Sequence, residues 1–193
     1  MPARRFGISS YISVQSKQMA MNTTTLNLIE HFEGLHDGDL TKIGLQPKMD
    51  PVGIWTEGWG RAMIDPTTKK FLKGKANAAK SLKYQTIHTR EEADQALQED
   101  LKQYEIFAAN ALGSVTWEKL NENQKGALVS FTYNCGVGKP PYKIWTNVAA
   151  YINNSMSKKD LIAYWQTSVI KSGGKILPGL VKRRAAEPKL FFS

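Results

Sequence analysis

The sequence has little of several residues that mark whole classes of protein. Its 193 residues include one cysteine, Cys135, and three histidines. One cysteine cannot form an internal disulfide, which excludes a disulfide scaffold. We expect that the protein is synthesised in a reducing compartment and that Cys135 is a structural thiol. The histidines lack the spacing of a zinc site and no H-E-x-x-H motif occurs, so we expect no metal. No run approaches the ~18 apolar residues of a membrane span.

Positive charge is the component in excess. The chain has 26 Lys and Arg against 17 Asp and Glu, a net charge of +9. Residues 139–193 carry ten basic and two acidic residues, whereas residues 21–138 carry 13 basic and 15 acidic. A basic surface suits nucleic acid, anionic lipid or a cell-wall polymer, and charge alone does not choose among them. Because no helix-turn-helix, RNP or zinc-finger signature occurs, we expect no specific nucleic-acid partner.

The chain divides into an extension and one domain. Residues 1–20 mix serine, glutamine and basic residues with a short, interrupted apolar patch. That patch is too short and too polar for a signal peptide, so we expect a poorly ordered N-terminal extension. We expect residues 21–193 to form a single domain, with a small β lobe over about 36–64 and a helical body over 89–193.

Capping residues and apolar spacing predict the helices. A leading helix is expected from Thr24 or Thr25 to Glu33, with threonine caps and Gly34 as the stop. Within the helical body, helices are expected to open at Thr89, Asn121, Ser157 and Pro178, with one more around Trp145. Short glycine-punctuated strands followed by many helices predict an α+β fold class.

Glu33 stands out in the leading helix. Leu26, Ile29 and Glu33 share the i, i+3, i+7 spacing of a buried stripe, so a carboxylate stands where leucine would be ordinary. A carboxyl group at the edge of an apolar stripe can act as a general acid. The alternative is an amphipathic-helix glutamate whose carboxylate reaches solvent.

A second carboxylate and a hydroxyl lie in the strand-forming segment. Asp50 precedes the expected turn, and Thr56 lies in the strand after it. Side chains alternate along a strand, so Glu57 is expected to face away from Thr56. Gly58 and Gly60 would let a bulky substrate approach the backbone. A carboxylic acid opposite a carboxylate and a hydroxyl is a workable glycosidase site, in which these two groups hold the attacking water.

Three ordered motifs resemble those of the phage-type lysozymes, the muramidase endolysins. The first joins F-E-G-L at residues 32–35 to D-P-V-G-I-W-T-E-G-W-G at residues 50–60. The others are L-N-x-x-Q-x-x-A-L-x-S-F-x-x-N-x-G at residues 120–136 and G-L-V-x-R-R-x-x-E at residues 179–187. The resemblance covers roughly residues 24–190, which is nearly the whole expected domain.

The resemblance implies a lysozyme-like fold, with a cleft between a mainly helical body and a small β-hairpin lobe. It implies hydrolysis of the β-1,4 bond between N-acetylmuramic acid and N-acetylglucosamine in bacterial peptidoglycan, without a cofactor. Glu33 would be the general acid, and Asp50 with Thr56 would position the water. Further residues near these motifs are candidates for substrate binding: Trp55, Gly58, Trp59, Gly60 and Asn134.

One departure from the family pattern lies between Glu33 and Asp50. Sixteen residues separate them, about twice the number in the commonest pattern, and the extra segment is roughly residues 37–48. The spacing from Asp50 to Thr56 is intact, so we place the insertion upstream of Asp50.

The densest basic cluster is Lys182, Arg183 and Arg184, in an amphipathic C-terminal segment. Its ordinary interpretation is a solvated helix face. A basic amphipathic segment can also engage an anionic membrane, lipopolysaccharide or the cell wall. We therefore treat these three residues as candidates for that contact.

The resemblance also implies a setting for the protein. We expect a monomer that is synthesised in the host cytoplasm and acts on the wall in the periplasm, after release through a membrane lesion made by another protein. Two alternatives stay open. A lytic transglycosylase would leave a 1,6-anhydro product, and a catalytically dead fold would be a basic wall- or membrane-binding module.

Overall fold

The computed structural model describes residues 21–33, 46–50 and 52–193. The expected N-terminal extension, residues 1–20, and residues 37–45 of the expected insertion lie outside the described residues. Within the described ranges, no helix combines the length and apolar character needed to cross a membrane.

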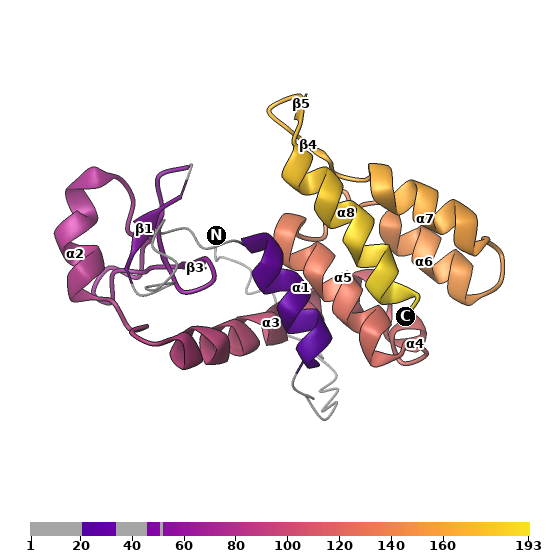
Figure 1. Cartoon of the computed structure of the whole chain (residues 1–193), viewed down its shortest axis with the longest axis horizontal. Coiled ribbons are helices and arrows are strands. Elements are labelled where there is room, and N and C mark those ends of the chain that lie inside the picture. Colours follow the sequence, from indigo (N-terminus) through magenta and orange to yellow (C-terminus); the bar gives the residue numbers. More distant parts are fainter. Residues whose placement is uncertain (1–20, 34–45, 51) are drawn as a thin grey trace, which may run out of the picture.

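Two lobes are joined by one long helix, α3 (Figure 1). The β lobe contains β1 (Lys48–Met49), β2 (Trp55–Glu57), β3 (Arg61–Ala62), the 3-10 helix η1 (Lys75–Asn77) and α2 (Ala78–Lys83). The helical side contains α1 (Thr23–Glu33), α3 (Arg90–Leu112), α4 (Ser114–Trp117), α5 (Glu122–Cys135), α6 (Ile144–Ile152), α7 (Lys158–Thr167), the hairpin of β4 (Lys171–Ser172) and β5 (Lys175–Ile176), and α8 (Pro178–Phe191). The α+β fold class is confirmed.

Side-chain caps mark the beginnings of α1, α3, α5 and α7. The Thr89 side chain accepts a hydrogen bond from the backbone of Glu92, and the Glu92 side chain returns one, which closes a capping box at α3. Asn121 and Gln124 do the same at α5. The expected threonine cap of α1 is wrong, because Asn22 Oδ1 accepts from Thr25 N at 2.9 Å and the helix begins at Thr23.

The three strands of the β lobe form an antiparallel sheet in chain order. Lys48 of β1 pairs with Thr56 of β2, and Thr56 pairs with Ala62 of β3. Asp50 builds the turn between β1 and β2, since its Oδ1 accepts from Val52 N at 2.9 Å and from Ile54 N at 2.7 Å. The turn and the register therefore hold Asp50 and Thr56 on one hairpin.

Helix α5 is the centre of the helical body. Its residues are buried continuously from Gly126 to Thr132, so this helix is buried all round rather than on one face. Helix α1 approaches it so closely that a Cβ at Gly126 would overlap the Thr25 side chain. Because α1 packs on α5 and α8, Glu33 at its end is carried by the helical body.

Candidate active site

Glu33 lies where α1 ends, between the two lobes. Its side chain is 19% exposed, and its Oε1 accepts a hydrogen bond from Arg183 Nη1 of α8 at 2.6 Å. On the other side is Gly60 of the β lobe, where a Cβ would lie only 3.7 Å from Glu33 Oε2. Gly60 has a positive φ of 97°, which suits glycine, and its missing side chain leaves room in front of the carboxylate.

A buried ion cluster stands behind Glu33. Arg183 and Arg184 are 2% and 0% exposed, and both contact Glu187, which is itself fully buried. The prediction that Arg183 and Arg184 form part of an exposed basic surface is therefore wrong. Their positive charges are used inside the protein, whereas Lys182 of the same cluster is exposed.

Tyr133 connects the helical body to the β lobe beside Glu33. Its hydroxyl donates to the Trp59 carbonyl at 2.9 Å, and the Tyr104 ring of α3 meets it edge-on at 4.8 Å. Burial raises the pKa of both tyrosines, and the nearby Glu33 carboxylate acts in the same direction. Both phenols therefore stay neutral near neutral pH, and neither supplies a competing charge.

Asp50 and Thr56 lie together on the β1–β2 hairpin. The Thr56 hydroxyl donates to the Lys48 carbonyl at 3.0 Å, which fixes its oxygen as an acceptor for a further group. Asp50 uses Oδ1 in its turn, which leaves Oδ2 without a hydrogen-bond partner among the described residues. Glu57 points to the opposite face, as its alternation with Thr56 predicts, and accepts from Thr86 N at 2.8 Å.

The catalytic candidates thus come from different lobes. Glu33 belongs to the helical body, and Asp50 and Thr56 belong to the β lobe. Among the described side chains, Glu33 is hydrogen-bonded to Arg183, and no hydrogen bond joins it to Asp50 or Thr56. A carboxyl group on one lobe with a carboxylate and a hydroxyl on the other is the set of groups that glycoside hydrolysis needs.

Two of the candidate substrate-binding residues serve packing instead. Trp59 is 5% exposed, donates from Nε1 to Asp94 at 2.7 Å, and lies under the Arg90 guanidinium at 4.4 Å. It therefore offers no free face to a sugar ring, and that expectation is wrong. Gly58 is also misassigned, because a Cβ there would lie 2.8 Å from Ile87 Cδ1. Its small size accommodates a side chain of the protein.

Of the three remaining candidates, Gly60 faces Glu33, and Trp55 and Asn134 have internal partners but are not fully buried. The half-buried Trp55 donates from its indole to the Gly74 carbonyl at 2.9 Å. Asn134 accepts a hydrogen bond from Arg184 Nη2 at 2.7 Å through Oδ1. Asn134 lies in the last turn of α5 and therefore joins the end of this helix to the buried ion cluster. Its role in substrate binding stays a prediction.

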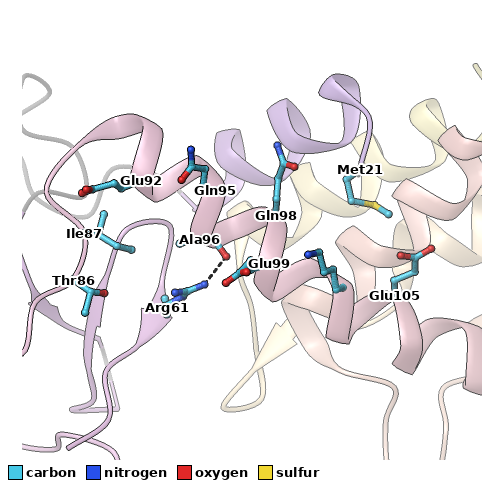
Figure 2. A pocket seen from close by; sticks show the side chains of 11 residues that line it. Met21, Arg61, Thr86, Ile87, Glu92, Gln95, Ala96, Gln98, Glu99 and Glu105 are labelled. Carbon is cyan, nitrogen blue, oxygen red and sulfur yellow. Dashed lines mark hydrogen bonds between the residues drawn. The ribbon is translucent and has the colours of Figure 1, made fainter. Parts of the chain in front are cut away.

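A separate hollow of about 610 Å³ runs along α3 (Figure 2). Residues that line it include Arg61, Glu99, Lys102 and Glu105, and none of the three catalytic candidates does. Arg61 Nη2 donates to the Ala96 carbonyl at 2.7 Å, as the dashed line shows. Through this hydrogen bond Arg61 joins β3 to α3 at one wall of the hollow. Glu33 is not among the lining residues.

Metal and thiol chemistry find no support in the described part of the chain. There, no cluster of three His, Cys, Asp or Glu side chains could hold a metal ion. Burial raises the pKa of the Cys135 thiol to about 11, and its Sγ donates to the Phe131 carbonyl at 3.0 Å. A protonated, internally bonded thiol has a structural role.

Sequence reasoning missed the partner of Glu33, Arg183, and the carboxylate behind it, Glu187. The contacts of Arg183 with α1 and of Glu187 with α5 span long stretches of chain, so they could not be recognised locally. One local signal was available. The R-R-x-x-E spacing places Glu187 four residues after Arg183 and three after Arg184, which is the spacing of internal helix ion pairs.

Comparison with known proteins agrees with this geometry. Residues 32–187 match the sequence model of the phage lysozyme family. The chain belongs to the phage lysozyme family. It is 32% identical over 129 residues to an endolysin of Bacillus phage PZA, which covers 66% of this chain and 46% of that protein. It is 25% identical over 175 residues to an endolysin of Bacillus phage B103, which covers 91% of this chain and 55% of that protein.

The chain therefore spans about half the length of these curated family members. Two solved structures share the lysozyme fold. The muramidase domain of SpmX from Asticaccaulis excentricus gives a TM-score of 0.55 at 23% identity, covering 90% of this chain and 97% of that one. The active form of the P1 phage endolysin Lyz gives 0.54 at 19% identity, covering 91% and 86%.

Proposed function

We propose that this chain is an endolysin-type muramidase, which hydrolyses the β-1,4 bond between N-acetylmuramic acid and N-acetylglucosamine in bacterial peptidoglycan. One observation carries the proposal. The Glu33 carboxylate is partly exposed at the end of α1, is held by the Arg183 guanidinium, and faces the side-chain-free Gly60 of the opposite lobe. An acid presented in this way can reach the oxygen of a glycosidic bond.

In the proposed reaction Glu33 gives its proton to the leaving glycosidic oxygen as the bond to the muramic carbon breaks. Asp50 and Thr56 hold a water molecule that attacks this carbon, and the water's proton passes to solvent or to Asp50. The Glu33 carboxylate formed in this step is the natural partner of Arg183, which lies 2.6 Å away. No metal or cofactor takes part.

The direct test is a pair of matched substitutions on α1. Glu33→Gln and Glu30→Gln make the same chemical change one helical turn apart, and Glu30 is paired with Arg90. We expect Glu33→Gln to abolish release of reducing sugar from purified peptidoglycan, and Glu30→Gln to retain it. Circular dichroism would show that both variants fold. Equal activity of Glu33→Gln and wild type would contradict the proposal.

A lytic transglycosylase is the second candidate, because the structure already uses part of the water-holding pair. Asp50 Oδ1 is committed to the β1–β2 turn, and the Thr56 hydroxyl donates to Lys48. In a transglycosylase both residues would be spectators. Asp50→Asn keeps the acceptor oxygen of the turn, so unchanged activity with 1,6-anhydro products would favour this candidate.

The basic surface is a separate proposal. Lys171 and Lys175 on the exposed β4–β5 hairpin adjoin the exposed Ile176, and Lys182 of α8 is also exposed. In Figure 1 the hairpin projects beyond α8. We propose that these lysines, rather than Arg183 and Arg184, contact the anionic surface of the cell envelope, membrane or lipopolysaccharide. The triple Lys→Gln variant should lose salt-sensitive binding to anionic vesicles, and retained binding would contradict this.

We further propose that the protein acts as a monomer, is made in the host cytoplasm, and reaches the periplasm through a lesion formed by a separate pore protein. Size-exclusion chromatography with light scattering would test the first point. Lysis that requires co-expression of a pore-forming protein would support release through a lesion, and lysis without one would contradict it.

A further inference from the structure

The ion cluster behind Glu33 has an imbalance of buried charge. Arg183 and Arg184 are both buried, yet among the residues that the structure describes only one buried carboxylate, Glu187, contacts them. Glu187 Oε1 is 3.1 Å from Arg184 Nη2 and 3.4 Å from Arg183 Nε. Two cations against one anion leave a surplus positive charge. The partly exposed carboxylate of Glu33 is the group that faces it.

We infer that Glu187 is a positioning residue for Glu33: it holds the Arg183 guanidinium and sets how much positive charge faces the Glu33 carboxylate. The inference rests on the proposed role of Glu33 as the general acid. Glu187 is fully buried and touches no substrate, so it would act only through Arg183.

Glu187 is held on both of its oxygens. Trp165 Nε1 donates to Oε2 at 2.9 Å, and the Ser130 hydroxyl donates to Oε1 at 3.0 Å. Burial raises the pKa of Glu187, and Arg184 and Arg183 act in the opposite direction. Donors of two other helices thus fix this carboxylate, and a fixed carboxylate can orient a neighbouring guanidinium.

Arg183 is the rigid link in this arrangement. Its Nη1 donates to Glu33, its Nη2 donates to the Ser130 carbonyl at 3.1 Å, and its Nε faces Glu187. The guanidinium is planar, so the hydrogen bonds of its two terminal nitrogens fix its plane as well as its position. The contact of Nε with Glu187 is an ion pair without a hydrogen bond. A change at Glu187 would therefore reach Glu33 through geometry and charge together.

Among the described residues, the other charged and titratable groups near Glu33 are neutral or already paired. Tyr133 of α5 and Tyr104 of α3 are phenols whose pKa is raised by burial. Asp100 of α3 is paired with Arg61 of β3 at 3.0 Å. On α1 itself, Glu30 is paired with Arg90 at 2.6 Å. Within the part of the chain that the structure describes, the α8 cluster is therefore the main source of charge facing Glu33.

Two substitutions in the cluster should shift the pH at which Glu33 loses its proton in opposite directions. Glu187→Gln removes an anion and increases the surplus, which favours the Glu33 anion. The acid form is then lost at lower pH. Arg184→Gln removes a cation and has the opposite effect, so the acid form persists to higher pH. Each step changes one charge within the same buried cluster.

The test is the pH dependence of kcat and KM on purified peptidoglycan. We expect the alkaline limb of kcat to move down by about one pH unit in Glu187→Gln and up by a similar amount in Arg184→Gln. Ser130→Ala removes two hydrogen bonds of the same cluster, to Glu187 and from Arg183, without changing its charge, and the alkaline limb of its kcat profile should stay in place. KM should change little in all three variants. Carboxyl carbon NMR would follow Glu33 directly.

Lower kcat with an unmoved alkaline limb in both charge variants would overturn the inference and leave Glu187 a structural residue. If Glu187→Gln fails to fold, Glu187→Asp and Arg184→Gln decide. Glu187→Asp keeps the charge and should retain the wild-type limb, and Arg184→Gln alone tests the predicted direction. A failure of the proposed function is distinguishable from a failure of this inference. If Glu33 is not the acid, Glu33→Gln remains active, regardless of the pH profiles of the cluster variants.

Discussion

Arg183 Nη1 lies 2.6 Å from Glu33 Oε1, and this ion pair joins the end of α1 to α8 across 150 residues of chain. Replacing Arg183 with Met leaves Glu187 with one guanidinium fewer and Glu33 with none. We expect a loss of about 1–3 kcal/mol in the free energy of unfolding, measured in urea, because Glu33 and Ser130 lose the hydrogen bonds of a charged donor while Glu187 keeps Arg184 as its buried partner. Lys182→Met is the matched control on the exposed side, and a similar loss there would contradict this account.

Thr56 should affect activity more than stability. Its hydroxyl is oriented by the Lys48 carbonyl. Thr56→Val keeps the shape and removes the oxygen, so we expect kcat to fall about 10²-fold because the water is no longer held in place. Thr56→Ser should retain most activity.

Thr146 provides the control, because its hydroxyl also donates to a backbone carbonyl, that of Lys143, at 3.0 Å. Thr146→Val should leave peptidoglycan hydrolysis unchanged. If Thr56→Val behaves like Thr146→Val, the water-positioning role is wrong.

Trp59 is expected to contribute to stability through its polar partners. Trp59→Phe removes the hydrogen bond to Asp94 and weakens the contact with Arg90. We expect about 1–2 kcal/mol less stability toward thermal or urea unfolding. Asp94→Asn keeps an acceptor oxygen and should cost less. Weaker binding of peptidoglycan fragments by Trp59→Phe, with an unchanged free energy of unfolding, would instead make Trp59 a substrate contact.

Glu105 predicts a pH-dependent term in stability. Burial raises its pKa from the ordinary value of 4.5, with Lys125 acting in the opposite direction. When the pKa of a carboxyl group is higher in the folded than in the unfolded protein, the group stabilises the fold at a pH below its unfolded-state pKa. This contribution is lost as the pH rises through its folded-state pKa. Glu105→Gln should therefore be more stable than wild type at pH 7, by less than about 1 kcal/mol, relative to the comparison at pH 4.

Thermal unfolding of both proteins at the two pH values measures this difference. Glu99→Gln, at an exposed position of the same helix, is the control. An equal difference between wild type and Glu105→Gln at both pH values would contradict the burial argument.

Local signals in the sequence predicted the elements that carry the site. The leading helix ends at Glu33, α3 opens with the Thr89 capping box, and α8 has Pro178 in its first turn, as expected. Capping and strand alternation act over a few residues, so one sequence contains them. This is why the hairpin that carries Asp50 and Thr56 could be expected.

The errors concern side chains whose partners are distant in the sequence. Arg183 and Arg184 were placed on the surface because charged residues are rarely buried. They are buried because Glu187, Glu33 and Asn134 supply acceptors from three elements of the fold. Trp59 was placed near substrate for a similar reason, since its partner Asp94 lies 35 residues away. Such pairings depend on packing that local patterns do not determine.

The most direct test of the central claim is mass spectrometry of the products released from purified peptidoglycan by wild type and Glu33→Gln. The account predicts reducing muramic acid ends from wild type and none from a folded Glu33→Gln variant. Products with 1,6-anhydro ends would contradict hydrolysis, and reducing ends from Glu33→Gln would contradict the assignment of Glu33 as the acid.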